Sequence, residues 1–437
     1  MRQPAIDCEQ QSRRRARAVA RVLFLLAVVV PIEAAGVRAP GSGIRWIGTW
    51  AAAPQAFMPG SLKEFRNQTL RLIVHTSIGG TRLRIRLSNT CGDRPLVFGG
   101  AHVARRTSGP DIEPASDRVL TFGGRPGVTV PKGATIVSDA VHFAVPALSD
   151  LAISLYLPDE TPATTGHFLA LQQSYVSSET GDSTGPTKFA AEKTIRSWPF
   201  LTGVEVDAPA DGAAIVAFGD SWFDGDGSTA DTNHRLPDIL AERLQQDARG
   251  ARFGVLNEGI IGNRLLRDSP REPPGKFGDA LGESGLKRLE RDALGQPGVR
   301  IVVVRIGVND LAFPGALTPA TDSVAAADLI AGYRKLVASA HHHGVRVIGT
   351  TITPFENATT APGYYTPEKE AARQEVNAWI RGNRDFDGMV DLDQVLRDPD
   401  HASRLLPAYD SGDHLHPNDA GYAAGANAIP LSVLGIR

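Results

Sequence analysis

The stretch Ile215-Val216-Ala217-Phe218-Gly219-Asp220-Ser221 is an apolar run that ends in Gly-Asp-Ser. The apolar residues favour a buried β-strand, and the glycine permits a tight turn from which a helix can start. A serine at such a turn lies beside the free N–H groups of the first helical turn. The stretch therefore predicts a nucleophilic serine, provided that the chain also supplies a base and donors for an oxyanion.

Strand-like and helix-like segments alternate around this stretch, from position 208 to the end of the chain. The strand-like runs are Ala213–Phe218, Phe253–Asn257, Ile301–Ile306, Val345–Thr351 and Gly388–Leu392. Apolar residues recur at helical spacing in Pro237–Gln246, Gly285–Leu294, Ala325–His343 and Pro367–Arg381. This alternation predicts a parallel sheet with helices on both faces, a three-layer α/β domain over residues 208–437. Its active site is expected beyond the carboxyl ends of the strands.

The residues before this domain show a period of two instead. In Arg82-Leu-Arg-Ile-Arg-Leu87, arginine alternates with leucine or isoleucine, and Leu151–Leu157 continues the pattern. Glycine pairs such as Gly79-Gly80 separate these short runs. Many short strands with frequent turns predict an all-β sandwich of jelly-roll type over residues 44–205.

The N-terminal residues have the layout of a secretory signal peptide. Five arginines between positions 13 and 21 precede the apolar run Val22–Val30, and small residues follow at positions 34–39. This order predicts a signal peptide over residues 1–39. The run is shorter than the about 20 residues that a membrane span needs, and an uncleaved anchor is the alternative. We therefore expect a secreted or periplasmic protein with no stable membrane span after signal cleavage.

Length and composition narrow the class of protein. A chain of 437 residues exceeds what one hydrophobic core usually serves, which favours two domains. Apolar residues make up 42% and charged residues 22%, as in soluble globular proteins. The net charge of -2 gives no reason to expect a nucleic acid as partner. Once Cys8 leaves with the signal peptide, Cys91 has no disulfide partner, so core burial must supply stability.

Four short segments carry residues suited to acyl transfer. They are Gly219–Ser221, Asn257–Asn263, Gly307–Asp310 and Asp413–Pro417. The Ser221 hydroxyl needs a general base, and His416 can accept its proton near neutral pH. Asp413, three residues earlier, can reach the other ring nitrogen and fix its orientation. His414 competes for the role of base, but the spacing from Asp413 favours His416.

The tetrahedral intermediate of acyl transfer carries a negative oxygen that needs preorganised hydrogen-bond donors. The backbone N–H groups of Ser221 and Gly262 and the side-chain amide of Asn309 are the predicted donors. Glycine at position 262 lets its N–H approach a ligand without an obstructing Cβ.

In this order, Gly-Asp-Ser, Asn-x-Gly-x-x-Gly, Gly-x-Asn-Asp and Asp-x-x-His resemble the four sequence blocks of the SGNH (GDSL-type) hydrolases. The resemblance covers about half the chain and implies a flavodoxin-like α/β/α sandwich and metal-independent ester hydrolysis without a cofactor. It also implies Ser221 as nucleophile, His416 as base, Asp413 as its partner, and Gly262 and Asn309 as oxyanion donors. One departure is Trp222, which stands where the name-giving pattern has leucine; we expect it at the edge of the acyl site.

The N-terminal half has a second, less specific resemblance. Trp46-Ile-Gly-Thr-Trp50-Ala, the arginine-rich strand and Leu87-Ser-Asn-Thr are similar to the β-domain of secreted bacterial SGNH acyl- and arylesterases. This resemblance favours a carbohydrate-linked ester as substrate. Trp46, Trp50 and Trp198 are candidates for a sugar-stacking platform, although core packing is the commoner use of tryptophan in a sandwich.

Two clusters suggest metal binding, and we favour other interpretations for both. Consecutive residues of a helix point about 100° apart, so His341–His343 cannot converge on one ion. Asp224, Asp226 and Asp231 lack the twelfth-position glutamate of a calcium loop, so we expect a solvated active-site loop.

The sequence therefore predicts an exported serine esterase that removes short acyl groups, with acetyl expected, from a carbohydrate or other secreted substrate, which is a small-molecule or polysaccharide ester. An acyltransferase acting on a sugar or peptidoglycan acceptor is the first alternative, because the acyl-enzyme is common to both reactions. The second is a carbohydrate-binding protein whose hydrolase domain is secondary. We take the β-sandwich as a scaffold or a substrate-positioning lid.

Overall fold

Residues 45–436 are described by the computed structural model, apart from positions 62–63, 179, 210, 275 and 383. The expected signal peptide over residues 1–39 lies outside the described residues. The stretch Ile44–Arg437 is one compact unit that holds an antiparallel and a parallel part. Among the described residues, no helix has the length and apolarity needed to span a membrane.

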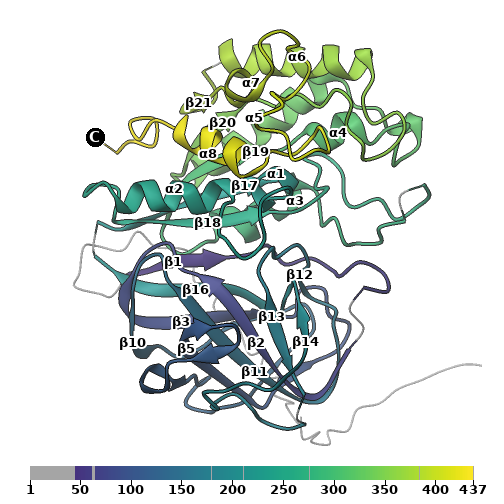
Figure 1. Cartoon of the computed structure of the whole chain (residues 1–437). Coiled ribbons are helices and arrows are strands. Elements are labelled where there is room, and N and C mark those ends of the chain that lie inside the picture. Colours follow the sequence, from purple (N-terminus) through teal and green to yellow (C-terminus); the bar gives the residue numbers. More distant parts are fainter. Residues whose placement is uncertain are drawn as a thin grey trace, which may run out of the picture. The chain divides into compact units, whose positions relative to one another are not determined.

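Two antiparallel sheets form the first part (Figure 1). One sheet has the order β1 (Arg45–Ala51), β16 (Leu201–Ala208), β3 (Gly80–Ser88), β10 (Val141–Val145), with β9 (Thr135–Val137) beside β3. The other has the order β14 (Ala191–Ile195), β13 (Ser174–Ser177), β2 (Glu64–His75), β11 (Asp150–Pro162), β5 (Gly100–Ser108), β6 (Asp111–Ile112), with β7 (Arg118–Val119) beside β5. Two short pairs join β12 (Gly166–His167) to β15 (Trp198–Pro199) and β4 (Leu96–Phe98) to β8 (Val128–Val130), and η1 (Pro114–Ser116) is a 3-10 turn.

Side chains from both antiparallel sheets meet in one buried apolar cluster, which includes Leu72 of β2, Ile85 of β3 and Ile153 of β11. Facing sheets that share a core confirm the predicted β-sandwich. Trp50 and Trp198 belong to this core, where their ring centroids lie 4.9 Å apart. Core packing therefore accounts for both tryptophans.

The second part has a parallel sheet with the order β18-β17-β19-β20-β21. Its strands are β17 (Ala213–Gly219), β18 (Phe253–Gly259), β19 (Val299–Arg305), β20 (Arg346–Thr350) and β21 (Gly388–Val390). All neighbouring pairs are parallel. The five strands lie within two residues of the predicted bounds at each end, and the strand order is the flavodoxin-like one.

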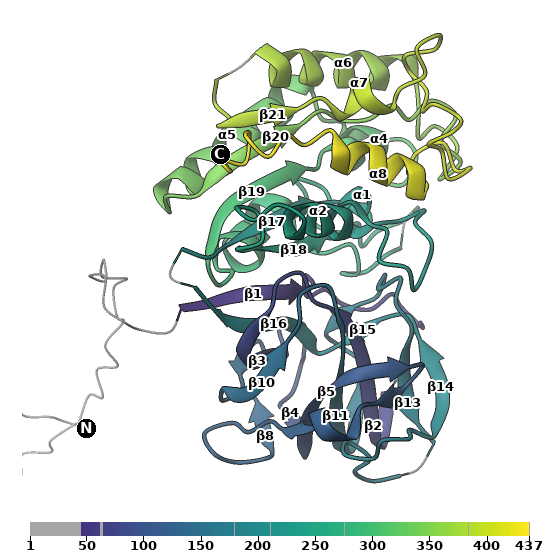
Figure 2. The same ribbon diagram turned by 60° about the vertical axis from the view of Figure 1, so that its left-hand side comes forward.

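Helices cover both faces of this sheet (Figures 1 and 2). They are α1 (Ser221–Asp224), α2 (Leu236–Gln245), α3 (Gly285–Leu289), α4 (Val308–Ala312), α5 (Ala326–His342), α6 (Pro367–Gly382), α7 (Leu392–Leu396) and α8 (Asp419–Asn427), with a π-helical turn η2 (Glu290–Leu294) and a 3-10 turn η3 (Ala320–Asp322). Side chains of β17 alternate between two buried clusters. Val216 packs with Leu336 of α5 in one, and Ile215 packs with Leu240 of α2 in the other. The predicted three-layer α/β/α sandwich is therefore confirmed.

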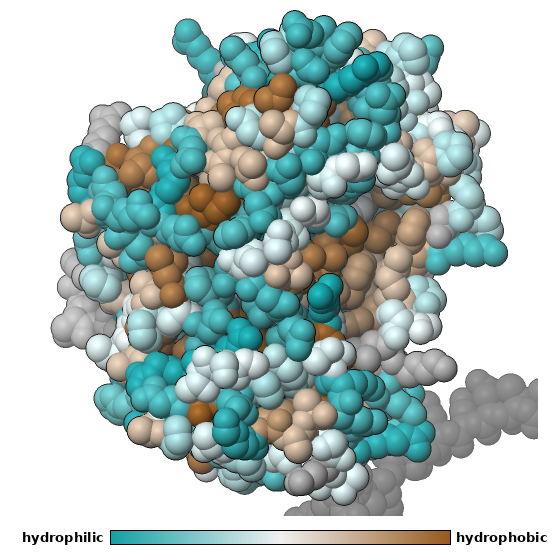
Figure 3. Space-filling model, viewed as in Figure 1, coloured by the Kyte–Doolittle hydropathy of each residue, from teal (hydrophilic) through white to brown (hydrophobic). Residues whose placement is uncertain are grey.

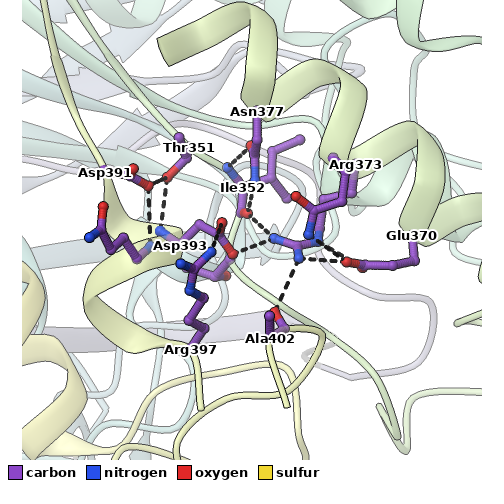
Figure 4. A network of polar contacts seen from close by, with 12 residues as sticks. Thr351, Ile352, Glu370, Arg373, Asn377, Asp391, Asp393, Arg397 and Ala402 are labelled. Carbon is purple, nitrogen blue, oxygen red and sulfur yellow. Dashed lines mark hydrogen bonds and ion pairs between the residues drawn. The ribbon is translucent and has the colours of Figure 1, made fainter. Parts of the chain in front are cut away.

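A polar network fixes the chain after β20 (Figure 4). The buried guanidinium of Arg373 on α6 donates to the carbonyl of Ile352 at 2.8 Å and to Asp393 at 2.6 Å. Glu370 pairs with the same guanidinium at 2.7 Å, and Asn377 donates to Ile352 at 2.8 Å. The network anchors Ile352, the residue directly before Thr353.

The two parts touch along β1 and β18. The N–H of Gly48 donates to the carbonyl of Pro297 at 3.1 Å, and Val255 N donates to Ser77 Oγ at 2.9 Å. A Cβ placed on Gly254 would lie 2.2 Å from the carbonyl oxygen of Gly48. Only a residue without a Cβ permits this approach of the two backbones.

The face of the molecule drawn in Figure 3 is mainly hydrophilic, with an apolar area at mid-height on the right.

Candidate active site

Ser221 stands where β17 ends and α1 begins, and its exposed fraction is 4%. Asp220 caps the helix, because its carboxylate accepts from the N–H of Trp222 at 3.2 Å. A Cβ on Gly219 would lie 2.1 Å from the carbonyl oxygen of Arg305, so glycine is required where β17 runs this close to β19. This turn presents the serine hydroxyl beyond the carboxyl end of the sheet.

The carboxylate of Asp220 forms an ion pair with Arg305, the last residue of β19. One guanidinium nitrogen lies 2.7 and 2.8 Å from the two carboxylate oxygens, and another donates to Thr353 at 2.7 Å. Both charged side chains are fully buried. Burial raises the pKa of Asp220, although the charge of Arg305 opposes this shift. The pair fixes the turn that carries the serine.

The structure brings the predicted base and acid to Ser221. His416 Nε2 lies 2.7 Å from Ser221 Oγ, and His416 Nδ1 lies 2.5 Å from Asp413 Oδ2. The other oxygen of Asp413 accepts the backbone N–H groups of Leu415 and His416, at 2.9 and 2.8 Å. His414 turns to Asp410 instead, at 2.5 Å. Of the two histidines, His416 alone contacts the serine.

A second carboxylate faces the same imidazole. Asp226 Oδ2 lies 3.8 Å from His416 Nδ1. Burial lowers the pKa of His416, but the bond to Asp413 and the charges of Asp226 and Asp413 outweigh it, so the pKa lies above the ordinary value. Burial raises the pKa of Asp413, yet its hydrogen bonds and the charge of His416 hold it well below its usual range. The two carboxylates therefore stabilise the imidazolium that forms when His416 takes up a proton.

The three predicted oxyanion donors are free to bind a ligand. Within the described residues, no acceptor bonds the backbone N–H of Ser221 or Gly262. Asn309, in the first turn of α4, donates one amide hydrogen to the carbonyl of Asn263 at 3.0 Å and keeps the other. Its oxygen accepts from the hydroxyl of Tyr364 at 2.8 Å, which sets the direction of the amide.

The loop after β18 is anchored at both ends. Gly262 has a φ of +71°, a conformation that suits glycine. Asp310 accepts the N–H groups of Leu265 and Leu266 at 2.6 and 2.9 Å, and burial raises the pKa of Asp310 to about 6. At the other end, a Cβ on Gly259 would lie 2.2 Å from the backbone nitrogen of Asp224. The loop thus rests directly on α1.

Two expectations from the sequence need correction. Trp222 is fully buried against Tyr422, with ring centroids 5.3 Å apart, and does not line the edge of the acyl site. Asp224 is 1% exposed and is not part of a solvated loop, since its carboxylate bonds His167 and the N–H of Ile261. Neither position could be predicted, because each side chain packs against a partner that is far away along the chain.

Neither histidine nor aspartate clusters point to a metal centre. Among the described residues, no group of three or more His, Cys, Asp or Glu side chains is placed to hold an ion. His341 pairs with Asp387 at 2.8 Å, whereas His343 bonds the carbonyl of Ser339 at 2.9 Å.

Comparison with known proteins gives a family match. Residues 217–424 match the model of the GDSL-like lipase/acylhydrolase family. Similar solved structures include an aryl esterase from M. smegmatis (18% identity, 52% of this chain and all of that one, TM-score 0.36). A second is an acetylxylan esterase mutant from Geobacillus stearothermophilus (21% identity, 52% of this chain and 96% of that one, TM-score 0.36). A third is a GDSL-like lipase from Bacteroides thetaiotaomicron (18% identity, 51% of this chain and 88% of that one, TM-score 0.34). A search among curated proteins gives no match. By this match, residues 217–424 form a GDSL-like lipase/acylhydrolase domain, the domain of a carboxylic ester hydrolase.

Proposed function

We propose that this protein is an exported serine esterase that hydrolyses short-chain acyl esters, with acetyl as the expected group and a carbohydrate as the expected alcohol. The observation that carries the proposal is the contact of His416 with both Ser221, at 2.7 Å, and Asp413, at 2.5 Å. A hydroxyl, an imidazole and a carboxylate in this order supply a nucleophile, a base and an orienting group.

The reaction follows from these contacts. Ser221 Oγ attacks the ester carbonyl carbon while His416 Nε2 takes its proton, and Asp413 stabilises the resulting imidazolium. The N–H groups of Ser221 and Gly262 and the amide of Asn309 receive the oxyanion. The intermediate collapses as His416 protonates the departing alcohol. Water then attacks the acyl-serine with His416 as base, and the carboxylic acid leaves.

The low exposure of the nucleophile and the base supports a short acyl chain, because the exposed fractions of Ser221 and His416 are 4% and 6%. The carbohydrate rests on the resemblance of the N-terminal half to the β-domain of secreted acyl- and arylesterases. Export rests on the arginines and the apolar run before position 31.

Replacement of the nucleophile tests the hydrolytic mechanism. Ser221→Ala should lower the turnover of 4-nitrophenyl acetate by about 10⁴-fold or more, because the triad residues act as a unit. The wild type should prefer acetate over longer 4-nitrophenyl esters and release acetate from acetylated xylan. Equal turnover by the wild type and Ser221→Ala would refute the mechanism. Product analysis with and without a sugar acceptor separates hydrolysis from acyl transfer.

A further inference from the structure

A segment of the β-sandwich, residues 167–173, runs along the loop that follows the nucleophile, residues 224–235. The N–H of Asp231 donates to the carbonyl of Leu171 at 2.8 Å, and the amide of Gln172 donates to the Asp231 carboxylate at 2.9 Å. The two segments are far apart in the sequence, so these bonds join the sandwich to the hydrolase part beside the active site.

The first contact of this segment is a buried histidine–carboxylate pair. His167 Nε2 lies 2.8 Å from Asp224 Oδ1, and His167 Nδ1 lies 3.1 Å from the carbonyl oxygen of Ala53. Their exposed fractions are only 3% and 1%. His167 thus joins the carbonyl oxygen of Ala53 in the sandwich to the carboxylate of Asp224 in the hydrolase part.

The other oxygen of Asp224 reaches the oxyanion loop. Asp224 Oδ2 accepts the N–H of Ile261 at 2.8 Å, and the next N–H along the chain is that of Gly262. Phe168, which follows His167, packs with Ile261 against the same apolar cluster of the hydrolase part. The sandwich therefore makes a polar contact, through Asp224, and an apolar contact at Ile261, the residue directly before the predicted oxyanion donor Gly262.

We propose that His167 is a positioning residue for ester hydrolysis, which gives the β-sandwich a direct part in catalysis. His167 holds the Asp224 carboxylate, Asp224 holds the Ile261 peptide, and this peptide sets the direction of the Gly262 N–H. The inference rests on the proposed function, because it requires Gly262 to bind the oxyanion. A donor displaced by about 1 Å costs up to about 100-fold in rate, and complete loss of one costs about 10²- to 10³-fold.

His167→Phe roughly keeps the volume of the ring and removes both ring nitrogens, and with them the contacts to Asp224 and Ala53. It should lower kcat for 4-nitrophenyl acetate by about 10- to 100-fold and leave KM within about threefold, because the donor acts mainly in the transition state. The kcat is expressed per active site, and active sites are titrated with a phosphonate that reacts covalently with Ser221. A loss of folded protein then does not change the measured kcat. In His167→Gln, the amide nitrogen can still reach Asp224, and most of the rate should return.

His102→Phe is the matched control. His102 also pairs with a carboxylate inside the sandwich, Asp117 at 3.0 Å, and among the described residues it forms no hydrogen bond or ion pair with the hydrolase part. Its replacement should leave kcat unchanged. If His167→Phe keeps kcat per active serine at the wild-type level and lowers only thermal stability, the contact is structural and the inference is wrong.

A second comparison remains decisive if His167→Phe does not fold. The side chain in His167→Asn is too short to reach Asp224, so this variant should lose rate relative to His167→Gln. Equal kcat in these two variants would also overturn the inference. Failure of the proposed function looks different, because the wild type itself would then show no hydrolysis that depends on Ser221.

Discussion

Asp226→Asn should extend activity to lower pH. Asp226 Oδ2 lies 3.8 Å from His416 Nδ1, and its side chain is one third exposed, at 33%. A negative charge at this distance favours the imidazolium and so raises the pKa of His416. Hydrolysis requires the neutral imidazole as base, so the rate falls as pH falls through this raised pKa.

The magnitude follows from the distance. Two unit charges 3.8 Å apart interact by about 1 kcal/mol in water and by about 4 kcal/mol at an effective dielectric constant of 20. Because Asp226 is partly exposed, the lower value applies, and about 1 kcal/mol corresponds to about 0.7 pH units. Loss of the charge lowers the pKa of His416, so the acid limb of kcat/KM should shift downward by about this amount.

The assay is the pH profile of kcat/KM for acetate release, measured over the acid limb for the wild type and Asp226→Asn. Asp231→Asn is the control, since it removes the same charge from the same loop, but its carboxylate bonds Gln172 and Gln173 and not His416. The control should keep the wild-type limb. An unchanged or upward-shifted limb in Asp226→Asn would refute the electrostatic account of His416.

Two further substitutions test the supports of the site. Arg305→Met leaves Asp220 as an unpaired buried charge and should lower the free energy of unfolding by about 3 to 5 kcal/mol, measured by urea denaturation; an unchanged midpoint would contradict the role of the ion pair. Tyr364→Phe removes a hydrogen bond worth about 1 kcal/mol from the oxygen of Asn309 and should reduce kcat by about fivefold with little change in KM. A rise in KM alone would assign Asn309 to substrate binding.

Periodicity predicted the fold because it reports local burial. The alternation of strands and helices after position 208 located all five strands of the parallel sheet, and the period of two predicted the sandwich. The spacing of Asp413 and His416 is equally local, which is why one carboxylate partner of the imidazole was visible in the sequence. The ordered blocks also placed Ser221, Gly262 and Asn309 at the ends of β17, β18 and β19.

The residues that hold the catalytic side chains in place could not be predicted from periodicity or local spacing. Arg305 and Asp220 are 85 residues apart, and His167 and Asp224 are 57 apart. In the sequence each is an ordinary charged or titratable residue, and only folding shows which partner it meets. Trp222 illustrates the same point, because its position beside the nucleophile suggested a place at the edge of the acyl site, whereas the structure buries it against Tyr422.

The backbone contact of Gly48 with Gly254 limits how this enzyme can be re-engineered. A Cβ at position 254 has no room, since the oxygen of Gly48 would lie 2.2 Å away. A foreign sandwich grafted onto the hydrolase half would also need a glycine at the position of Gly48, because a Cβ there would lie 2.7 Å from Leu256 Cδ1. The sandwich and the hydrolase part therefore cannot be exchanged independently of each other. A functional chimaera would have to keep the residues on both sides of the contact, Gly48 and Gly254.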